Sequence, residues 1–173
     1  MTEPERETEA GAERPRIEGA VGLGVDIVEI ERMAAILERT KSFARRVFSE
    51  NERAYCDSKA NPAAHYATRF AAKEAVVKAL GTGFSQGIGV RDIEVKRTKA
   101  GKPYIALTGK AREIADAQGV RDLSISLSYT HTDAVACAMA VTEESLRASE
   151  RRKDPMEELT KQFKETRGIL DEL

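Results

Sequence analysis

The order of hydrophobic patterns along the chain predicts an α+β fold in which a largely antiparallel sheet packs with one long central helix. A strand-like segment comes first, a series of helical segments follows, and two pairs of alternating segments separated by a further helix complete the pattern. Segments of alternating hydrophobicity joined by short turns pair as antiparallel strands, and grouped helices pack against the resulting sheet. The length of 173 residues suits one domain with polar additions.

The N-terminal end differs from the middle of the chain in charge and hydrophobicity. Residues 1–18 carry a net charge of −3 and almost no apolar side chains, so we expect a disordered extension. Residues 19–142, the predicted domain, carry a net charge of +4. This mildly basic balance suits a phosphorylated small molecule or an acidic protein partner, and it is too weak to indicate nucleic acid.

The C-terminal residues 143–173 form a polar extension with a net charge of −2. Within it, Asp154, Pro155 and Glu157 form a helix-start signal, and a thin apolar stripe follows them. This helix could dock on the body of the protein or on a partner, although so narrow a stripe more often marks a marginal helix. The extension is therefore predicted to be polar and helical.

No apolar run approaches the roughly 20 residues that cross a membrane, and the N-terminus has no signal-peptide pattern. We therefore expect a cytoplasmic protein that does not enter a membrane. Cys56 and Cys137 lack metal-ligand spacing, and free buried thiols are the expected state in a reducing compartment.

The first structured segment is a β-branched run from Val21 to Ile30, which predicts a buried strand with Asp26 inside it. A lone carboxylate in such a place is costly unless it is paired, hydrogen-bonded or bound to a metal. Two interpretations of Asp26 are equally open at this stage. It caps the helix that follows, or it is a ligand.

Residues 29–46 show helical spacing and are rich in arginine. Ordinary solvated charges are the usual explanation of such a run. One stripe, however, mixes cations with apolar residues, as docking of an acidic amphipathic helix would require. The stripe contains Arg32, Ile36, Arg39 and Phe43, with Arg46 as a neighbour. Ser49 then starts a short helix that carries Tyr55 and Cys56.

The central helix is predicted between Asn61, a suitable N-cap, and Gly81, which supplies a left-handed stop. Pro62 suits the first helical position, and the many alanines allow another backbone to come close. Glu74 and Lys78 lie one turn apart and could form an ordinary surface pair worth a few tenths of a kcal/mol. The turn Gly81-Thr82-Gly83, however, lets a backbone approach a phosphate. Together these features indicate a metal-and-phosphate site.

The remaining elements follow from alternation and turn signals. A hairpin is predicted from residues 92–96 and 103–107, a helix from Thr108 to Gln118 with Gly119 as its stop, and strands over residues 123–128 and 134–141.

Two motifs show that the chain resembles the holo-acyl-carrier-protein synthase family, the short trimeric type of bacterial 4′-phosphopantetheinyl transferase. They are Gly24-Val25-Asp26-Ile27-Val28-Glu29-Ile30-Glu31-Arg32 and Arg69-Phe70-Ala71-Ala72-Lys73-Glu74-Ala75 through Lys78-Ala79-Leu80-Gly81-Thr82-Gly83. The resemblance spans about residues 21 to 141 and leaves both termini outside it. It implies a 4′-phosphopantetheinyl transferase-like fold.

The resemblance implies a Mg²⁺-dependent enzyme of fatty acid biosynthesis. Such an enzyme transfers 4′-phosphopantetheine from coenzyme A to a serine of apo-acyl carrier protein and releases 3′,5′-ADP. Asp26 and Glu74 match the metal-binding pair, and Lys78 matches a catalytic residue that faces the coenzyme A phosphates. Lys73 points about 100° away from Glu74 on an ideal helix, so its role is less certain. Either a metal-bound water or one of the carboxylates could accept the serine proton.

Further positions follow from the same resemblance. The glycine turn Gly81-Thr82-Gly83 belongs to the phosphate side of the coenzyme A site, and Gly101 and Pro103 match a loop near the adenine. The stripe of Arg32, Ile36, Arg39, Phe43 and Arg46 matches the surface that docks the acidic carrier protein. The family forms homotrimers with active sites between subunits, so the same assembly is expected here.

Two positions depart from the family pattern. Ala100 stands where the family often places a polar residue, and Tyr129 stands where it usually places a histidine near the pyrophosphate. His131 could reach the same site from two residues further on, or the Tyr129 hydroxyl could donate instead. A lone loop histidine is more often structural or solvated. A second hypothesis is therefore a binding module that docks the carrier protein without transferring the group.

Overall fold

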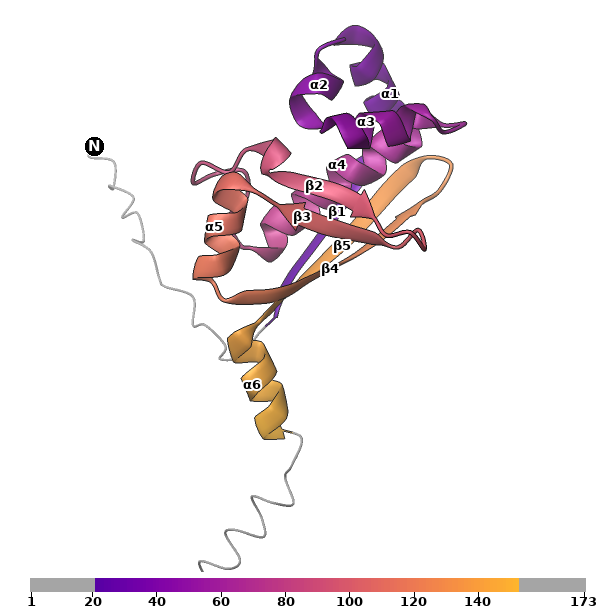
Figure 1. Cartoon of the computed structure of the whole chain (residues 1–173). Coiled ribbons are helices and arrows are strands. Elements are labelled where there is room, and N and C mark those ends of the chain that lie inside the picture. Colours follow the sequence, from indigo (N-terminus) through magenta and orange to yellow (C-terminus); the bar gives the residue numbers. More distant parts are fainter. Residues whose placement is uncertain (1–20, 153–173) are drawn as a thin grey trace, which may run out of the picture.

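The computed structural model describes residues 21–152, arranged as two antiparallel sheets and a set of helices (Figure 1). The disorder predicted for residues 1–18 and the helix predicted from Asp154 lie outside the described residues. No helix between residues 21 and 152 has the length and the apolar character that crossing a bilayer requires.

The predicted strands all form, and they are divided between two sheets. The larger sheet has the order β1-β5-β4. The strand β1 (Gly22–Glu29) contains most of the first sequence motif, and β4 (Val120–Tyr129) and β5 (Asp133–Thr142) form a hairpin. The smaller sheet is the hairpin of β2 (Ile93–Arg97) and β3 (Pro103–Leu107). Because β1 pairs with β5, Asp26 lies opposite Ala136, far from it in the sequence. The α+β class with antiparallel pairing is confirmed.

The central helix α4 (Pro62–Ala79) lies across the larger sheet, against β1 and β5, and its predicted ends are confirmed (Figure 1). The Asn61 side chain accepts a hydrogen bond from the Ala64 N–H at 3.2 Å, and Pro62 occupies the first helical position. Gly81 follows the helix with φ +70°, the left-handed conformation that glycine adopts at least cost.

Two glycines of β1 explain how closely the strand and the helix approach. A Cβ atom added at Gly22 would lie 2.1 Å from the carbonyl oxygen of Ala79, and one at Gly24 would lie 1.9 Å from that of Ala75. No side chain fits at either position. The small residues on both elements therefore let the backbones touch, as the alanines predicted, and this contact holds Asp26 beside α4.

The prediction of a buried strand is correct for one face of β1 only. Leu23 and Ile27 are 62% and 63% exposed. The strand lies at the edge of its sheet and packs α4 on one face only, so the even-numbered side chains point inward and the odd-numbered ones point outward. We call the exposed group Leu23, Val25, Ile27 and Met139 the outer apolar face.

The single helix predicted over residues 29–46 was also wrong. The chain forms α1 (Ile30–Arg39) and α2 (Phe43–Val47), with a turn between them in which the Phe43 N–H donates to the Thr40 carbonyl at 2.8 Å. Thr40 and Ser42 have low helix propensity because their hydroxyl groups compete for backbone hydrogen bonds. The docking stripe is therefore shared between two helices.

The other helices match their sequence signals in part. Ser49 caps α3 (Glu50–Asp57) in a capping box with Glu52, as its position predicted. Thr108 precedes α5 (Gly109–Ala117), but its side chain makes no cap contact and its hydroxyl donates to the Asp92 carbonyl at 3.4 Å. After β5 the chain enters α6 (Glu143–Arg152) directly.

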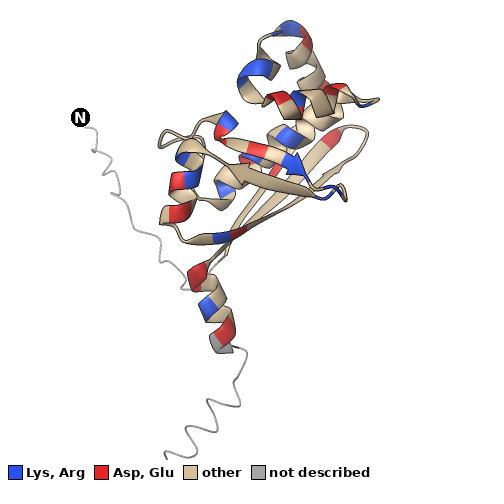
Figure 2. Cartoon of the chain, viewed as in Figure 1, with Lys and Arg blue, Asp and Glu red and all other residues tan. Residues whose placement is uncertain are grey.

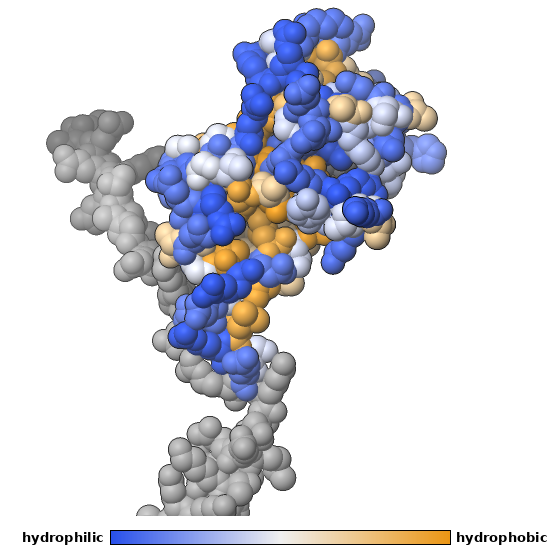
Figure 3. Space-filling view, in the orientation of Figure 1, coloured by the Kyte–Doolittle hydropathy of each residue, from blue (hydrophilic) through white to orange (hydrophobic). Residues whose placement is uncertain are grey.

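A groove with both apolar and charged lining residues lies between α5, β3 and β4, where orange surface borders polar surface in Figure 3. It has a volume of about 290 Å³, with Ile105, Leu107 and Leu123 among its lining residues. Cys56 is buried and Cys137 is half-buried, and neither forms a disulfide. Burial raises the pKa of the Cys56 thiol to about 12, which leaves it protonated and inert.

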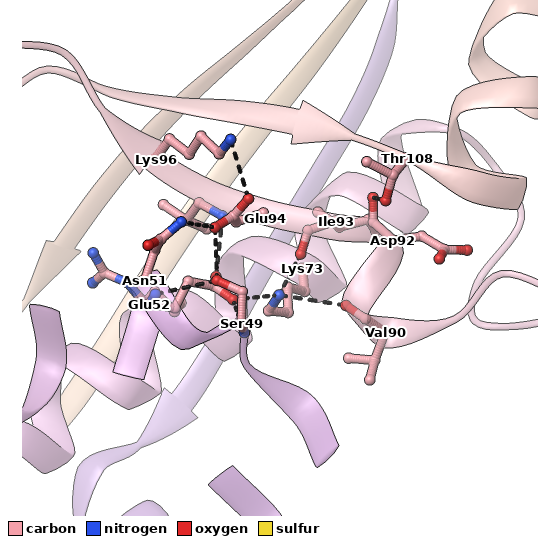
Figure 4. Close-up of polar contacts among 12 residues, drawn as sticks. Ser49, Asn51, Glu52, Lys73, Val90, Asp92, Ile93, Glu94, Lys96 and Thr108 are labelled. Atoms are coloured by element: carbon pink, nitrogen blue, oxygen red, sulfur yellow. Dashed lines mark hydrogen bonds and ion pairs between the residues drawn. The ribbon is translucent and has the colours of Figure 1, made fainter. Parts of the chain in front are cut away.

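A buried ion pair joins α3, α4 and β2 (Figure 4). The Lys73 ammonium lies 3.0 Å from Glu52 Oε2 and also donates to the carbonyls of Ile93 and Val90. The other oxygen of Glu52 accepts from the Val95 N–H at 3.0 Å. Burial lowers the Lys73 pKa, and Glu52 opposes that shift. The hydrogen bonds of the Lys73 ammonium are therefore all made within the fold, and its role is structural.

Candidate active site

Asp26 is placed by the alternation of β1. It occupies an inward-facing position of that strand, so its carboxylate points towards α4 instead of into solvent. The close contact of Gly24 with Ala75 brings the strand within reach of the side chains on that part of the helix. Of the two interpretations left open for Asp26, the helix cap is wrong, because the N-cap residue of α1 is Glu29, without a side-chain cap contact.

Glu74 and Lys78 face Asp26 from α4. The Lys78 ammonium lies 2.7 Å from Asp26 Oδ1 and 3.0 Å from the carbonyl oxygen of Val25. Glu74 lies one turn earlier on the helix, close enough to Asp26 for the charge of that carboxylate to raise the Glu74 pKa. The structure thus brings together the three residues that the sequence analysis named as the catalytic set.

The electrostatic state of Glu74 reflects this proximity. Partial burial is the main cause that raises its pKa above the usual value, the Asp26 carboxylate raises it further, and the Lys78 ammonium opposes both. A carboxylate in such surroundings is stabilised by a nearby cation. The pair is therefore a favourable place for positive charge.

A cavity of about 520 Å³ opens beside these carboxylates. Asp26 and Glu74 line it from β1 and α4, and Arg32 lines it from α1. The rest of its wall is mostly apolar, with two further carboxylates, and is formed by Ile27, Val28, Glu29, Met33, Ile36, Phe43, Phe70 and Asp133. A pocket with an apolar wall and a few convergent polar groups has the general form of a ligand site.

The donor set fits a hard divalent cation. Within residues 21–152 no group of three or more His, Cys, Asp or Glu side chains converges as a metal cage would. Mg²⁺ usually binds through one or two carboxylates and keeps waters and substrate phosphates as its other ligands. Two carboxylates at the edge of an open cavity meet that requirement, whereas a structural zinc site would need four protein ligands.

The predicted docking residues are only partly brought together. Arg32, Ile36 and Phe43 line the cavity, despite the break between α1 and α2. Arg39 and Arg46 are exposed on the same two helices, outside the cavity wall. Figure 2 shows these helices as a cluster with several blue segments at one end of the molecule. A cationic rim beside an apolar wall suits an acidic helix.

The glycine turn does not line the cavity. Gly81 and Gly83 are exposed with positive φ, and a Cβ atom at either would meet nothing within 4 Å. The Thr82 hydroxyl is turned inward and donates to the Val77 carbonyl at 3.4 Å. The turn has the open backbone that the phosphate prediction requires, and its contact with a phosphate stays a prediction.

A second cavity, of about 100 Å³, is lined by two arginines to which the sequence analysis assigned no role, Arg69 and Arg97. Arg69, only 3% exposed, stacks 4.0 Å from the centre of the Tyr55 ring, and Arg97 donates to the Tyr55 hydroxyl at 2.6 Å. Within the described part of the chain, Arg69 Nε has no hydrogen-bond partner. The guanidinium groups of Arg69 and Arg97 therefore make this cavity a favourable place for an anion to bind.

The second cavity also includes one departure from the family pattern, Tyr129. Pro103 and Tyr129 line it, and the Tyr129 ring packs edge-on against His65 at 5.5 Å. Burial and the neighbouring cations lower the His65 pKa, with Arg69 the strongest of them. His131 lies in the exposed β4–β5 turn and lines neither cavity, and Gly101 forms the β2–β3 turn with φ +85°. The ligand roles of Gly101 and His131 stay predictions.

The sequence signals for this second cavity were weak. Arg69 lies inside the long motif, but nothing in its spacing shows that Tyr55, His65 and Arg97 converge on it. That convergence arises because α3 and β2 contact each other and both pack against α4.

Comparison with known proteins gives a consistent result. A family model described as the 4′-phosphopantetheinyl transferase superfamily matches residues 22–139. A protein of Syntrophus aciditrophicus named holo-[acyl-carrier-protein] synthase is 45% identical over 116 residues, which are 66% of this chain and 91% of that protein. A protein of the same name from Alkaliphilus metalliredigens is 48% identical over 120 residues, 69% of this chain and 97% of its own.

Solved structures agree with the sequence relatives. The holo-[acyl-carrier-protein] synthase of Helicobacter pylori in complex with coenzyme A superposes with a TM-score of 0.61 at 31% identity. The match covers 68% of this chain and 98% of that one. The relatives thus match the described body of the chain and leave its two ends outside.

Proposed function

Because this chain belongs to the holo-[acyl-carrier-protein] synthases of the 4′-phosphopantetheinyl transferase superfamily, we propose that it transfers 4′-phosphopantetheine from coenzyme A to a serine of an apo-acyl carrier protein in a Mg²⁺-dependent reaction. The other product is 3′,5′-ADP. One observation carries the proposal. Asp26, Glu74 and Lys78, from a strand and a helix far apart in the sequence, converge at the edge of a cavity of about 520 Å³.

The chemistry requires neutralised charge and an aligned nucleophile more than covalent help from the protein. Asp26 and Glu74 would hold the Mg²⁺, which would supply positive charge to the pyrophosphate when bound. Lys78 provides a mobile ammonium beside them, because its side chain is 49% exposed and can reach a phosphate oxygen without leaving the site.

The two arginines of the second cavity fit the phosphates of coenzyme A. Coenzyme A carries a pyrophosphate and a ribose phosphate, so it needs more than one cationic site. Arg69 is already oriented by Tyr55 and lines the cavity, so its guanidinium could offer charge-assisted hydrogen bonds. Pro103 at the rim agrees with an adenine-side position for this cavity.

The carrier protein would dock on α1 and α2, with its serine directed at the carboxylates. The apolar wall of the first cavity would receive the pantetheine arm, and Arg32 lines the same cavity. The serine hydroxyl must lose its proton to a group within hydrogen-bond reach, and Asp26 and Glu74 are two of the carboxylates that line the cavity. We place this reaction in the cytoplasm and in fatty acid biosynthesis.

A homotrimer would explain the outer apolar face. Leu23, Val25, Ile27 and Met139 expose apolar surface in one group on the sheet, and surface of this kind usually marks an interface. Burying it against a second copy would also place β1, and with it Asp26, near a subunit boundary. Measurement of the molar mass in solution, by light scattering, tests the trimer directly.

The experiment that tests the function is an intact-mass assay of a purified apo-acyl carrier protein. Incubation with this protein, coenzyme A and Mg²⁺ should add the mass of one phosphopantetheine group to the carrier. Omission of the metal, with a chelator present, should prevent the addition. No mass increase with Mg²⁺, Mn²⁺ or any other divalent cation would refute the proposal.

A further inference from the structure

Lys78 forms an ion pair with Asp26, one of the two proposed metal ligands. Its ammonium is held by two acceptors on the strand, Asp26 Oδ1 at 2.7 Å and the Val25 carbonyl at 3.0 Å. The lysine side chain is 49% exposed and that of Asp26 is 17% exposed. This is a short, well-oriented contact that nevertheless remains open to solvent.

Glu74 is not neutralised in the same way. Among residues 21–152 it makes no ion pair or hydrogen bond, although Asp26 and Lys78 both influence it. One ammonium therefore serves two carboxylates and contacts only one of them. The site has a deficit of positive charge that a divalent cation would remove.

We propose that Lys78 is a displaceable counter-ion, which competes with the divalent cation for Asp26 and moves to the coenzyme A pyrophosphate when the cation binds. This inference rests on the proposed metal role of Asp26 and Glu74. It assigns Lys78 two successive partners, so that metal binding and pyrophosphate binding assist each other through the same side chain.

The physical reason is like-charge repulsion over a short distance. A Mg²⁺ ion lies about 2.0–2.1 Å from its carboxylate oxygens. An ammonium 2.7 Å from the same carboxylate would therefore be a close neighbour of the ion. Half-exposed ion pairs are weak, and a lysine stem has several rotatable bonds, so displacement costs little. By linkage, a ligand that attracts the displaced ammonium raises metal affinity, and the metal raises the affinity for that ligand equally.

The test is Mn²⁺ binding to the full chain, measured by electron paramagnetic resonance without coenzyme A. Lys78→Met should bind Mn²⁺ more tightly than the unmodified protein, by about 3- to 10-fold. Lys110→Met is the matched control, because Lys110 is 47% exposed and contacts one carboxylate, Glu113, at 2.8 Å. That variant should leave Mn²⁺ affinity unchanged. Adding coenzyme A should then raise Mn²⁺ affinity by a larger factor in the unmodified protein than in Lys78→Met.

Each other outcome has a defined meaning. Equal or weaker Mn²⁺ binding by Lys78→Met overturns the competition. If the double variant Asp26→Asn/Glu74→Gln binds Mn²⁺ as well as the unmodified protein, the metal role itself fails, and that result is distinct from failure of the competition alone.

Discussion

Lys73 and Glu74 are neighbours in the sequence and belong to opposite regions of the molecule. Successive residues of a helix point about 100° apart, so Lys73 faces the interior between α3 and β2 while Glu74 faces the cavity. Lys73 is fully buried and has three hydrogen-bond acceptors. Glu74 is half-buried and has no such partner within the described chain.

This contrast between Lys73 and Glu74 distinguishes charged residues that stabilise the fold from charged residues that take part in binding or catalysis. A buried charge that is completely hydrogen-bonded contributes to one native arrangement and has no capacity left for a ligand. A partly buried charge that lies beside a like charge is unfavourable by itself and is stabilised only by a cation. Changes at the two positions should therefore affect different properties, stability at Lys73 and transfer at Glu74.

The largest effect on stability is expected for Lys73→Met. Removing the ammonium leaves Glu52 charged and buried without its partner, which typically costs about 3–5 kcal/mol. Unfolding in urea, followed by circular dichroism, measures this loss. Adding Glu52→Gln should restore a large part of the loss, because the amide carries no charge to neutralise. A loss below about 1 kcal/mol for Lys73→Met would show that the pair is not needed by the fold.

The second-largest effect is expected for Glu74→Gln, which should reduce phosphopantetheine transfer and leave stability nearly unchanged. Phosphopantetheine transfer should fall by about 100-fold or more, because one ligand of the charge-neutralising cation is lost. The free energy of unfolding should change by less than about 0.5 kcal/mol. The rate comes from the intact-mass assay and the stability from urea unfolding. Unchanged turnover in this variant would exclude Glu74 from the metal site.

A smaller effect is expected at the docking surface. Arg32→Gln should raise the KM for the carrier protein about 2- to 5-fold and leave kcat nearly constant, as expected for a rim charge. Arg112→Gln is the matched control, since Arg112 is an exposed arginine of α5 paired with Asp116. Steady-state kinetics at two salt concentrations provide the measurement. Equal changes in both variants would show that the surface of α1 and α2 has no special part in docking.

The smallest effect concerns pH. Because the Glu74 pKa is raised in the folded protein, the folded state binds a proton more readily than the unfolded state between the usual value of 4.5 and the raised pKa. Glu74 therefore lowers stability as pH rises through that window, and the deficit stays constant above it. Glu74→Gln should gain stability over the unmodified protein across the same window, by less than about 0.5 kcal/mol. Parallel unfolding curves from acid to neutral pH measure the difference, and a difference that shrinks as pH rises would contradict it.

The elements with local signals could be predicted from the sequence. Asn61, Pro62 and Gly81 determine the ends of α4 through contacts within a few residues, and the hairpin of β2 and β3 follows from alternation and a glycine turn. The break after Arg39 was missed because it depends on the weak preference of Thr40 and Ser42. The exposure of β1 was missed because a hydrophobic run does not show whether a sheet continues on its other side.

The candidate site could be predicted only in part, for the same reason. Asp26, Glu74 and Lys78 were found because they lie in two long motifs, and the fold brings them together as expected. The fixed role of Lys73 and the convergence of Arg69 and Arg97 on Tyr55 depend on how α3 and β2 pack against α4. Packing of this kind joins distant segments and leaves no periodic trace in the chain.

The central claim is that Asp26 and Glu74 together hold the divalent cation of the transfer reaction. Anomalous diffraction from crystals of the protein grown with Mn²⁺ and coenzyme A tests it most directly. The account predicts one manganese peak within about 2.0–2.3 Å of oxygens from both carboxylates, with Lys78 turned from Asp26 to a phosphate oxygen. A peak bound elsewhere, or coenzyme A bound with no peak between the two carboxylates, would contradict it.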